Sequence, residues 1–214
     1  MYNVILFDLD GTLTDPAQGI TNSVAYALEY YGIHVEDKSE LNKFIGPPLI
    51  GAFEEYYNFS HDRAVEALAK YREYFSTRGI FENKIYDGVP QMLNELIKRE
   101  KRLIVATSKP DEFAVKILKH FDIYDRFEFV AGATMDEKRT DKAEVIEYAL
   151  GSCGISECRE CVMIGDRKHD VIGANKCGLD SIGVTYGYGG HDELTAAGAT
   201  YLATSVNDIL KIIE

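Results

Sequence analysis

The chain has 214 residues, of which 46% are hydrophobic, and its 23 Lys and Arg against 35 Asp and Glu give a formal net charge of -12. This apolar content is ample for a folded core, and the acidic balance argues against nucleic acid as a partner. Because no apolar run approaches the roughly 20 residues that span a bilayer and no secretion signal is visible, we expect a cytoplasmic protein without membrane contact.

The first predicted element is a buried parallel strand over residues 4–7, which delivers Asp8 and Asp10 to a turn at Gly11. Two carboxylates this close repel each other and lose hydration, so they need a cation or a shared proton. Asp and Gly are also common in ordinary turns, so this motif alone leaves a structural and a chemical interpretation equally open. A calcium loop fits poorly, because Gly11 comes fourth and position twelve is Gly19 rather than Glu.

The next seventy residues have the apolar spacing of helices and contain no predicted strand. We expect a helix over 17–31, a short helix over 38–45, a rigid loop at Gly46-Pro47-Pro48 and a further helix that ends at residue 57. Ser60 can cap the next helix, whose apolar face is Ala64, Leu68, Tyr71 and Phe75. A helical segment placed behind the first strand is typical of an insertion. The sequence therefore predicts a helical cap, residues 16–84, inserted into a core formed by 1–15 and 85–214.

From Tyr86 the chain alternates helix and strand, which predicts a doubly wound α/β domain with a parallel sheet. The expected helices cover 89–98, 111–121, 140–151, 170–177, 192–197 and 205–213, and the expected strands cover 102–107, 127–131, 161–164, 181–185 and 200–202. Ligands of such domains bind beyond the carboxyl ends of the strands.

Three of these strand ends carry polar motifs. Asp8 and Asp10 follow the first strand, Thr107-Ser108-Lys109 ends the 102–107 strand, and Gly165-Asp166-x3-Asp170 follows the 161–164 strand. Three or four carboxylates crowded into one pocket call for a divalent cation, and oxygen ligands suit Mg2+. Asp166 and Asp170 could instead simply cap a helix.

Four cysteines, at positions 153, 158, 161 and 177, are too few for a disulfide scaffold. The pair Cys158-x2-Cys161 suggests zinc, but no His follows at ligand spacing. We therefore expect reduced, partly buried thiols.

Asp8-Leu9-Asp10-Gly11-Thr12-Leu13-Thr14, Thr107-Ser108-Lys109, Lys142 and Gly165-Asp166-x3-Asp170 together resemble the four motifs of the haloacid dehalogenase-like hydrolases. The inserted helices resemble the C1 cap of that family, and the tail resembles its phosphoglycolate phosphatase branch. The resemblance implies a Mg2+-dependent phosphatase that forms an aspartyl phosphate.

Carried over to this sequence, the resemblance makes Asp8 the nucleophile and Asp10 the acid and base. Asp8, the backbone carbonyl of Asp10, and Asp166 would bind Mg2+, with Asp170 behind them. Thr107 and Lys142 would be catalytic, although Lys109 competes with Lys142 for the lysine role.

The resemblance also implies a set of groups that bind the phosphate or the substrate. These are the backbone amides of Leu9 and Ser108, Lys109, and the cap loop at Ile45, Gly46 and Pro47.

Several alternatives stay open at this point. Asp10 favours phosphoryl chemistry over dehalogenation, but a phosphosugar mutase, a phosphonate hydrolase using Lys38 or Lys43, or a non-catalytic phosphate-binding module are not ruled out. The sequence segment around Gly46-Pro47-Pro48 resembles that of relatives called 5'-nucleotidase. This resemblance favours nucleoside monophosphates over phosphoglycolate and sugar phosphates as the substrate. We expect a small phosphate ester as the substrate and a monomer or homodimer as the assembly.

Overall fold

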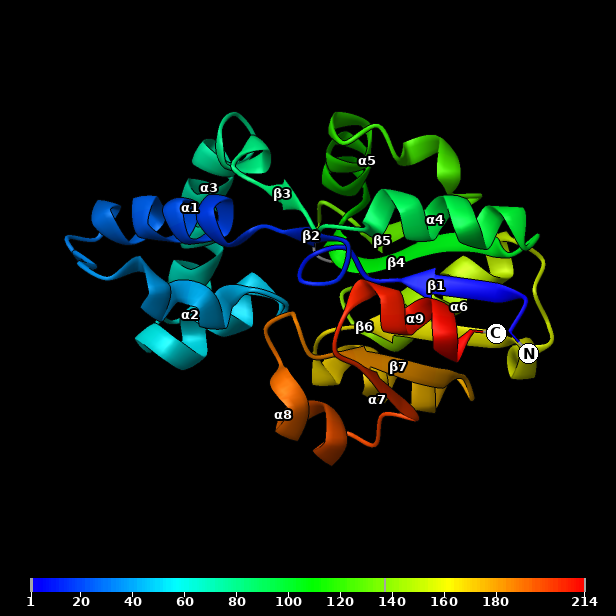
Figure 1. Cartoon of the computed structure of the whole chain (residues 1–214). Helices are drawn as coiled ribbons and strands as arrows, with labels where there is room; N and C mark the ends of the chain where they lie inside the picture. The colour runs from blue at the N-terminus through cyan, green and yellow to red at the C-terminus, as the bar shows by residue number, and fades with distance from the viewer. Residues whose placement is uncertain (1, 137, 214) are drawn as a thin grey trace. The chain divides into compact units, whose positions relative to one another are not determined.

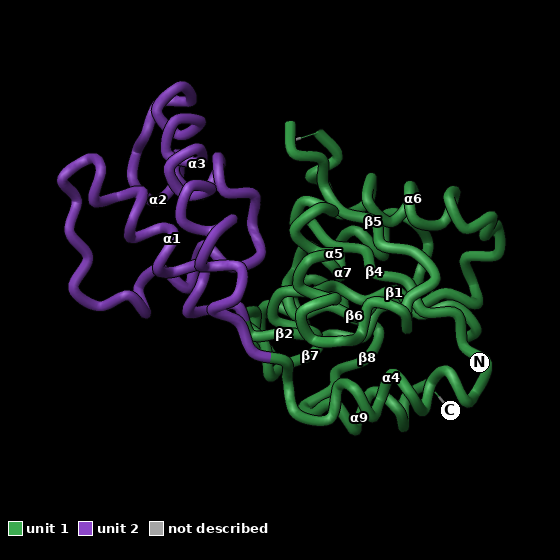
Figure 2. Tube along the Cα trace, turned by 90° about the horizontal axis from the view of Figure 1, so that it is seen from above, with its two compact units in different colours: residues 1–15, 85–214 green, residues 16–84 purple. Residues whose placement is uncertain are grey.

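The computed structural model describes residues 2–136 and 138–213, and it separates into two compact units, residues 1–15 with 85–214 and residues 16–84 (Figures 1 and 2). Two short strands, β2 (Thr14–Asp15) and β3 (Lys84–Ile85), pair with each other where the chain passes from one unit to the other. None of the described helices is long and apolar enough to cross a membrane.

The first unit is an α/β domain around a six-stranded sheet. Its strands are β1 (Val4–Phe7), β4 (Arg102–Pro110), β5 (Phe129–Ala133), β6 (Cys161–Gly165), β7 (Asp180–Val184) and β8 (Tyr201–Ala203). Its helices are α4 (Val89–Lys98), α5 (Asp111–His120), α6 (Lys142–Ser152), α7 (Lys168–Lys176), α8 (Gly190–Ala196) and α9 (Val206–Ile212), with 3-10 turns η3 (Tyr124–Arg126) and η4 (Cys158–Glu160).

The strand order places β1 at the topological centre of this sheet. The order is β5-β4-β1-β6-β7-β8, and all neighbouring strands are parallel. The chain therefore builds outward from β1 to β4 and β5, and then returns to the other side of β1 to add β6, β7 and β8. Folds with such a reversal bind ligands beyond the carboxyl ends of the strands at this point, which here is the end of β1.

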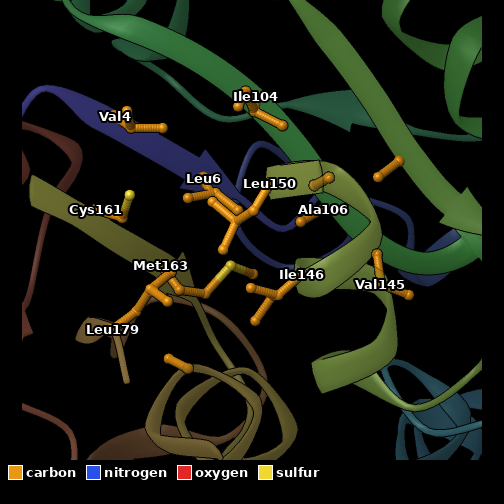
Figure 3. Close-up of a cluster of buried hydrophobic side chains, with 13 residues drawn as sticks. Val4, Leu6, Ile104, Ala106, Val145, Ile146, Leu150, Cys161, Met163 and Leu179 are labelled. Carbon is orange, nitrogen blue, oxygen red and sulfur yellow. The ribbon is translucent and has the colours of Figure 1, made fainter. Parts of the chain in front are cut away.

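Both faces of the sheet are buried, because alternate residues of a strand point to opposite faces. One face contributes Val4, Leu6 and Met163 to an apolar cluster that α6 covers with Ile146 and Leu150 (Figure 3). Ile5 and Phe7, which alternate with these residues along β1, are fully buried as well. Helices α4, with a strongly apolar side, and α9 pack against each other and contact β4 and β8, respectively. The domain is thus doubly wound, as the alternating elements predicted.

Strand β5 departs from its expected range, since it begins at Phe129 rather than at residue 127. The turn η3 occupies Tyr124–Arg126, and the Phe127 amide donates to the Tyr124 carbonyl at 3.1 Å. The Phe127 ring instead packs edge-on against Phe7, with centroids 6.2 Å apart. Phe127, which the sequence placed in a strand, therefore packs into the core from the end of a turn.

The second unit, residues 16–84, is helical apart from the Lys84 end of β3. It consists of α1 (Ala17–Tyr30), η1 (Lys38–Phe44), α2 (Leu49–Tyr57), α3 (His61–Phe75) and η2 (Gly79–Phe81). Helix α3 packs against both α1 and α2, and its Ser60 cap accepts a hydrogen bond from the Arg63 amide. Phe44 and Phe53 are buried with their ring centroids 5.0 Å apart. These rings belong to the core of this unit.

Candidate active site

The site begins with the turn that follows β1. The Leu9 carbonyl accepts hydrogen bonds from the Leu13 and Thr14 amides at 2.9 and 3.0 Å, and the Gly11 amide donates to the Thr14 carbonyl at 2.7 Å. Gly11 has φ +83°, and a Cβ at this position would lie 2.2 Å from Asp166 Oδ2. Only glycine meets both conditions, since it tolerates a positive φ and has no side chain to collide with the carboxylate.

Lys142, the first residue of α6, joins the first and last motifs. Its ammonium lies 2.8 Å from Asp8 Oδ1 and 2.8 Å from Asp170 Oδ1, and it also donates to the Ala106 carbonyl at 3.1 Å. All three charged side chains are buried. Burial alone would lower the pKa of Lys142, but Asp170 and Asp8 outweigh it and raise this pKa above its usual range. Lys142 therefore holds a positive charge between the two acids.

Asp166 lies at the end of β6 and is fully buried. Its Oδ2 accepts a hydrogen bond from the Tyr188 amide at 2.7 Å, and Thr12 Oγ1 lies 3.4 Å from its Oδ1. Burial, followed by the charges of Asp170 and Asp8, raises the pKa of Asp166 well above its usual range. A cation bound beside such a buried carboxyl group would stabilise its ionised form.

Asp170 is the third residue of α7, and its Oδ2 accepts a hydrogen bond from the Arg167 amide at 3.1 Å. Burial raises the pKa of Asp170 to about 6, although the Lys142 ammonium pulls in the opposite direction. Gly165 makes room for this side chain, because a Cβ there would lie 2.1 Å from Asp170 Cγ. The carboxylate thus serves both as a helix cap and as a member of the polar cluster, so the two interpretations of this motif are compatible.

Asp8, Asp166 and Asp170 form a group that could hold a metal ion. One carboxylate oxygen from each lies within 4.8 Å of the others. With Asp10, the site contains four buried acids and the two buried ammonium groups of Lys142 and Lys109, so it has an excess of two negative charges when all four acids are ionised. Oxygen donors with this excess match a divalent cation. Asp170 thus lies within the group, whereas the sequence placed it behind the ligands.

Asp10 pairs with the other lysine. Lys109 Nζ lies 2.6 Å from Asp10 Oδ2, and both side chains are nearly inaccessible to solvent. Burial raises the pKa of Asp10, while Lys109 acts against this shift. The two candidate lysines of the sequence therefore have different neighbours: Lys142 contacts Asp8 and Asp170, and Lys109 contacts Asp10.

The end of β4 brings the remaining core candidates to the same edge. Thr107 is buried, and its Oγ1 accepts a hydrogen bond from the Lys109 amide at 3.3 Å. Ser108 Oγ donates to the Thr140 carbonyl at 3.2 Å, which ties this strand end to the segment before α6. Leu9, which follows Asp8 in the turn after β1, is fully buried.

Three further candidates, Ile45, Gly46 and Pro47, lie in the helical unit between η1 and α2. The Ile45 side chain is fully buried in that unit, whereas Gly46 and Pro47 are partly exposed. Because the whole Ile45 residue is inaccessible to solvent, Gly46 and Pro47 are the candidates of this loop that present a surface to a substrate.

The cysteines lie elsewhere. Cys161 is buried in the apolar cluster beneath the sheet, and Cys153, Cys158 and Cys177 pack against that cluster. All four are free thiols, and among the described residues only the three aspartates form a potential metal group. Cys161 is thus fully buried, and the other three cysteines are partly buried.

Two tyrosines support the site, Tyr186 and Tyr188, which the sequence indicated only as part of the tail that resembles the phosphoglycolate phosphatase branch. Tyr186 OH donates to the Thr12 carbonyl at 3.0 Å, and Tyr188 OH hydrogen-bonds the Asp15 carboxylate, so both hold the segment that follows the first motif. Burial raises the pKa of each tyrosine above its usual range, so each keeps its proton to donate. Both tyrosines follow β7, at the carboxyl edge of a predicted parallel strand, and this position could have indicated a role at the site.

The family model described as haloacid dehalogenase-like hydrolase matches residues 5–184 of this chain. A 5'-nucleotidase from Pseudomonas aeruginosa is 45% identical over 100% of this chain and 96% of its own length. The tyrosine-protein kinase PtkA of Mycobacterium bovis is 39% identical over 92% of this chain and 67% of its own length. A crystal structure of a predicted phosphatase from Clostridium acetobutylicum is 51% identical, covers 100% of this chain and 98% of its own, and has a TM-score of 0.97.

Proposed function

Because this chain belongs to the haloacid dehalogenase-like hydrolase family, we propose that it is a Mg2+-dependent phosphatase that hydrolyses small phosphate monoesters through an aspartyl phosphate on Asp8. The observation that carries this proposal is the buried group of Asp8, Asp166 and Asp170 at the carboxyl edge of the sheet, beside Asp10. Nucleophile, proton-transfer group and metal-binding acids are then within one pocket of the α/β unit.

The carboxylates fit Mg2+ in number and type. Asp8, Asp166 and Asp170 would hold the ion, together with the backbone carbonyl of Asp10, and their excess negative charge would be balanced by it. When bound, Mg2+ would supply a positive charge that orients the phosphoryl group and offsets the charge of its oxygens.

The reaction would proceed in two balanced steps. Asp8 attacks phosphorus, the bond from phosphorus to the ester oxygen breaks, and Asp10 gives that oxygen a proton. Asp10, now a carboxylate, takes a proton from water as this water attacks phosphorus. The bond between Asp8 and phosphorus then breaks, which releases inorganic phosphate and restores both acids.

Neutral and cationic donors would hold the phosphoryl group during both steps. We assign Thr107 Oγ1 and the backbone amides of Leu9 and Ser108, which follow the paired residues Phe7 and Val105 of β1 and β4, as donors to the phosphoryl oxygens. Lys142 keeps Asp8 in place and reduces the repulsion between the nucleophile and an anionic substrate. This gives Lys142, rather than Lys109, the role of the family lysine.

For the substrate we propose a nucleoside monophosphate, ahead of phosphoglycolate and sugar phosphates, with selection by the helical unit of residues 16–84. The support is the 45% identical relative named 5'-nucleotidase, which this chain covers almost completely. Gly46 and Pro47, partly exposed in a rigid loop, are the candidate specificity residues. We propose a cytoplasmic enzyme that acts as a monomer or a homodimer.

A second candidate function is transfer of the phosphoryl group from Asp8 to a hydroxyl acceptor other than water. The specific observation is the relative named tyrosine-protein kinase, 39% identical over most of this chain. The first step would be unchanged, and an acceptor hydroxyl would replace water in the second. Phosphate release that is slower than consumption of the donor, with a phosphorylated acceptor as product, would favour this function.

Turnover of p-nitrophenyl phosphate tests the main proposal. We expect activity with Mg2+ that EDTA removes, and a loss on the order of 10³-fold or more in Asp8→Asn, because the variant lacks the nucleophile. Asp192→Asn, which makes the same change at a fully exposed acid, should keep wild-type turnover. Undiminished activity of Asp8→Asn would refute the nucleophile, and phosphate binding without turnover in the wild type would point to a non-catalytic module.

A further inference from the structure

Each acid of the first motif has its own buried lysine. Lys142 lies against Asp8, whereas Lys109 Nζ lies 2.6 Å from Asp10 Oδ2. We propose that Lys109 is a positioning residue, which holds one oxygen of Asp10 so that the other faces the oxygen that gains or loses a proton. This inference rests on the proposed function and replaces the substrate-binding role that the sequence suggested for Lys109.

The backbone around Lys109 is placed by an irregularity in the sheet. Ala106 pairs with Ala131 and Pro110 with Ala133, so β4 uses four steps where β5 uses two. Lys109 lies within this irregular stretch, and its side chain is only 6% exposed. Strand β5 confines the lysine further, because a Cβ on Gly132 would lie 2.6 Å from the Lys109 carbonyl oxygen. A lysine fixed in this way can orient a partner more narrowly than a lysine on a loop.

The free side of Asp10 shows what it is positioned for. Asp10 Oδ1 is buried and has no hydrogen-bond partner within the described part of the chain. A buried polar oxygen without a partner is costly, and such atoms are concentrated where a ligand completes the pairing. Since Lys109 holds Oδ2, the only oxygen of Asp10 left to meet the leaving group or the attacking water is Oδ1.

The pairing matters most in the second step of the reaction. There Oδ1 takes a proton from water while water oxygen bonds to phosphorus and the bond from phosphorus to Asp8 breaks. The ammonium of Lys109 keeps the carboxylate of Asp10 in one orientation until this proton is transferred. Loss of the lysine would leave Asp10 present but free to turn, which slows proton transfer without altering how the phosphoryl group is bound.

The test uses Lys109→Met with p-nitrophenyl phosphate, because nitrophenolate leaves without a proton. We expect kcat to fall about 100-fold, within the range of general acid and base catalysis, while kcat/KM changes less than about threefold. Rapid mixing should then show a burst of one nitrophenolate for each active site, followed by slow turnover. This split arises because formation of the aspartyl phosphate is spared and its hydrolysis is not.

Variants of the partner make the test specific. Asp10→Asn should show the same split, and Lys109→Met should cause no further loss in that background, since the lysine acts only through Asp10. Lys109→Arg, which keeps the charge, should recover part of kcat. Lys211→Met, which removes the lysine of an exposed pair at 2.8 Å to Asp208, should leave both constants unchanged.

Other outcomes would overturn the inference. An equal fall in kcat and kcat/KM without a burst would mean that Lys109 binds the phosphoryl group, and unchanged constants would deny it any role. Circular dichroism and melting temperature identify a folding defect, and the double variant removes both buried charges if the single variant does not fold. Failure of the proposed function is distinct, because Asp8→Asn would then keep its activity.

Discussion

Asp8 and Asp10 are two residues apart and are both buried, yet their immediate surroundings differ. Lys142 connects Asp8 to Asp170, and Lys109 contacts Asp10. A nucleophile and a proton-transfer group have different requirements, since one must stay charged and the other must change its charge during the reaction. Separate lysines allow each acid to be held independently. Residue identity alone could not show this, because both lysines were compatible with the same role.

Lys142→Met tests the electrostatic part of this arrangement. It removes the cation between Asp8 and Asp170, and the buried charge left behind should cost about 3–5 kcal/mol of unfolding free energy without metal. Urea unfolding followed by circular dichroism measures the loss, and Mg2+ should restore part of it.

The control for that variant is Lys176→Met, since Lys176 forms an exposed pair with Asp141 at 3.3 Å. We expect a change below about 1 kcal/mol there. Adding Asp170→Asn to Lys142→Met should recover stability, because it removes one of the unpaired charges. Equal stability of the two lysine variants would contradict the role given to Lys142.

The cysteines give a prediction on pH. Burial raises the pKa of Cys161 and that of Cys177 to about 11, so both thiols stay protonated in the folded protein well past the pH at which an exposed thiol ionises. Two pKa units reduce the thiolate fraction at pH 8 about 100-fold. Iodoacetamide labelling read by mass spectrometry should therefore be slow at these positions, accelerate as the pH approaches 11, and become rapid in urea.

The raised pKa values of these thiols also make the unfolding free energy fall at high pH. A protonated thiol is favoured by the fold, so its contribution is complete below the unfolded pKa and is lost as the pH rises toward the folded value. Fast labelling of Cys161 in the native protein at pH 8 would instead indicate a reactive thiol and reopen a redox role.

At the level of elements, two glycines make room for acids of the site: Gly11 in the turn after β1 and Gly165 at the end of β6. Gly11 lies against Asp166, and Gly165 lies against Asp170, so two glycines make room for two of the acids. The glycines follow strands in the sequence and were readable as turns, but their contacts with carboxylates were not. Such contacts depend on how two neighbouring strands are aligned, which local spacing does not determine.

Gly11→Ala and Gly178→Ala form a matched pair for this element. Both glycines have positive φ, +83° and +72°, but a Cβ at Gly11 would lie 2.2 Å from Asp166 Oδ2, whereas Gly178 has open space around it. Gly178→Ala should therefore cost only the backbone strain, about 1 kcal/mol. Gly11→Ala should cost more in urea unfolding and also weaken Mg2+ binding, because it displaces Asp166. Equal effects of the two variants would show that the turn does not support the acid.

At the scale of the whole molecule, the alternation of helices and strands was enough to predict a doubly wound sheet with polar groups at its carboxyl edge. The strand order adds that β1 lies between β4 and β6, which brings the ends of these three strands together. The irregular pairing of β4 with β5 could not be predicted, because it comes from tertiary alignment rather than from residue pattern. For that reason the pairing of Lys109 with Asp10 could not be predicted from the sequence, although both residues were identified as candidates.

Metal binding should be visible in the stability of the whole protein. A ligand that binds only the folded state at 100 times its Kd adds about 2.7 kcal/mol to unfolding, so saturating Mg2+ should raise the urea midpoint of the wild type. Asp166→Asn should abolish this gain and yet be at least as stable as the wild type without metal, because it replaces a carboxyl whose ionisation burial disfavours and can still accept from the Tyr188 amide. A Mg2+ effect of equal size in the variant would exclude Asp166 as a ligand.

The most direct measurement for the central claim is detection of the phosphoryl group on the enzyme. Turnover of a phosphate ester is stopped with acid, in which acyl phosphates survive, and the digested protein is examined by mass spectrometry. The account predicts one phosphoryl group on the peptide that contains Asp8, labile to hydroxylamine and absent from Asp8→Asn. A phosphoryl group on another residue, or none while the wild type turns over and Lys109→Met accumulates nothing, would contradict nucleophilic attack by Asp8.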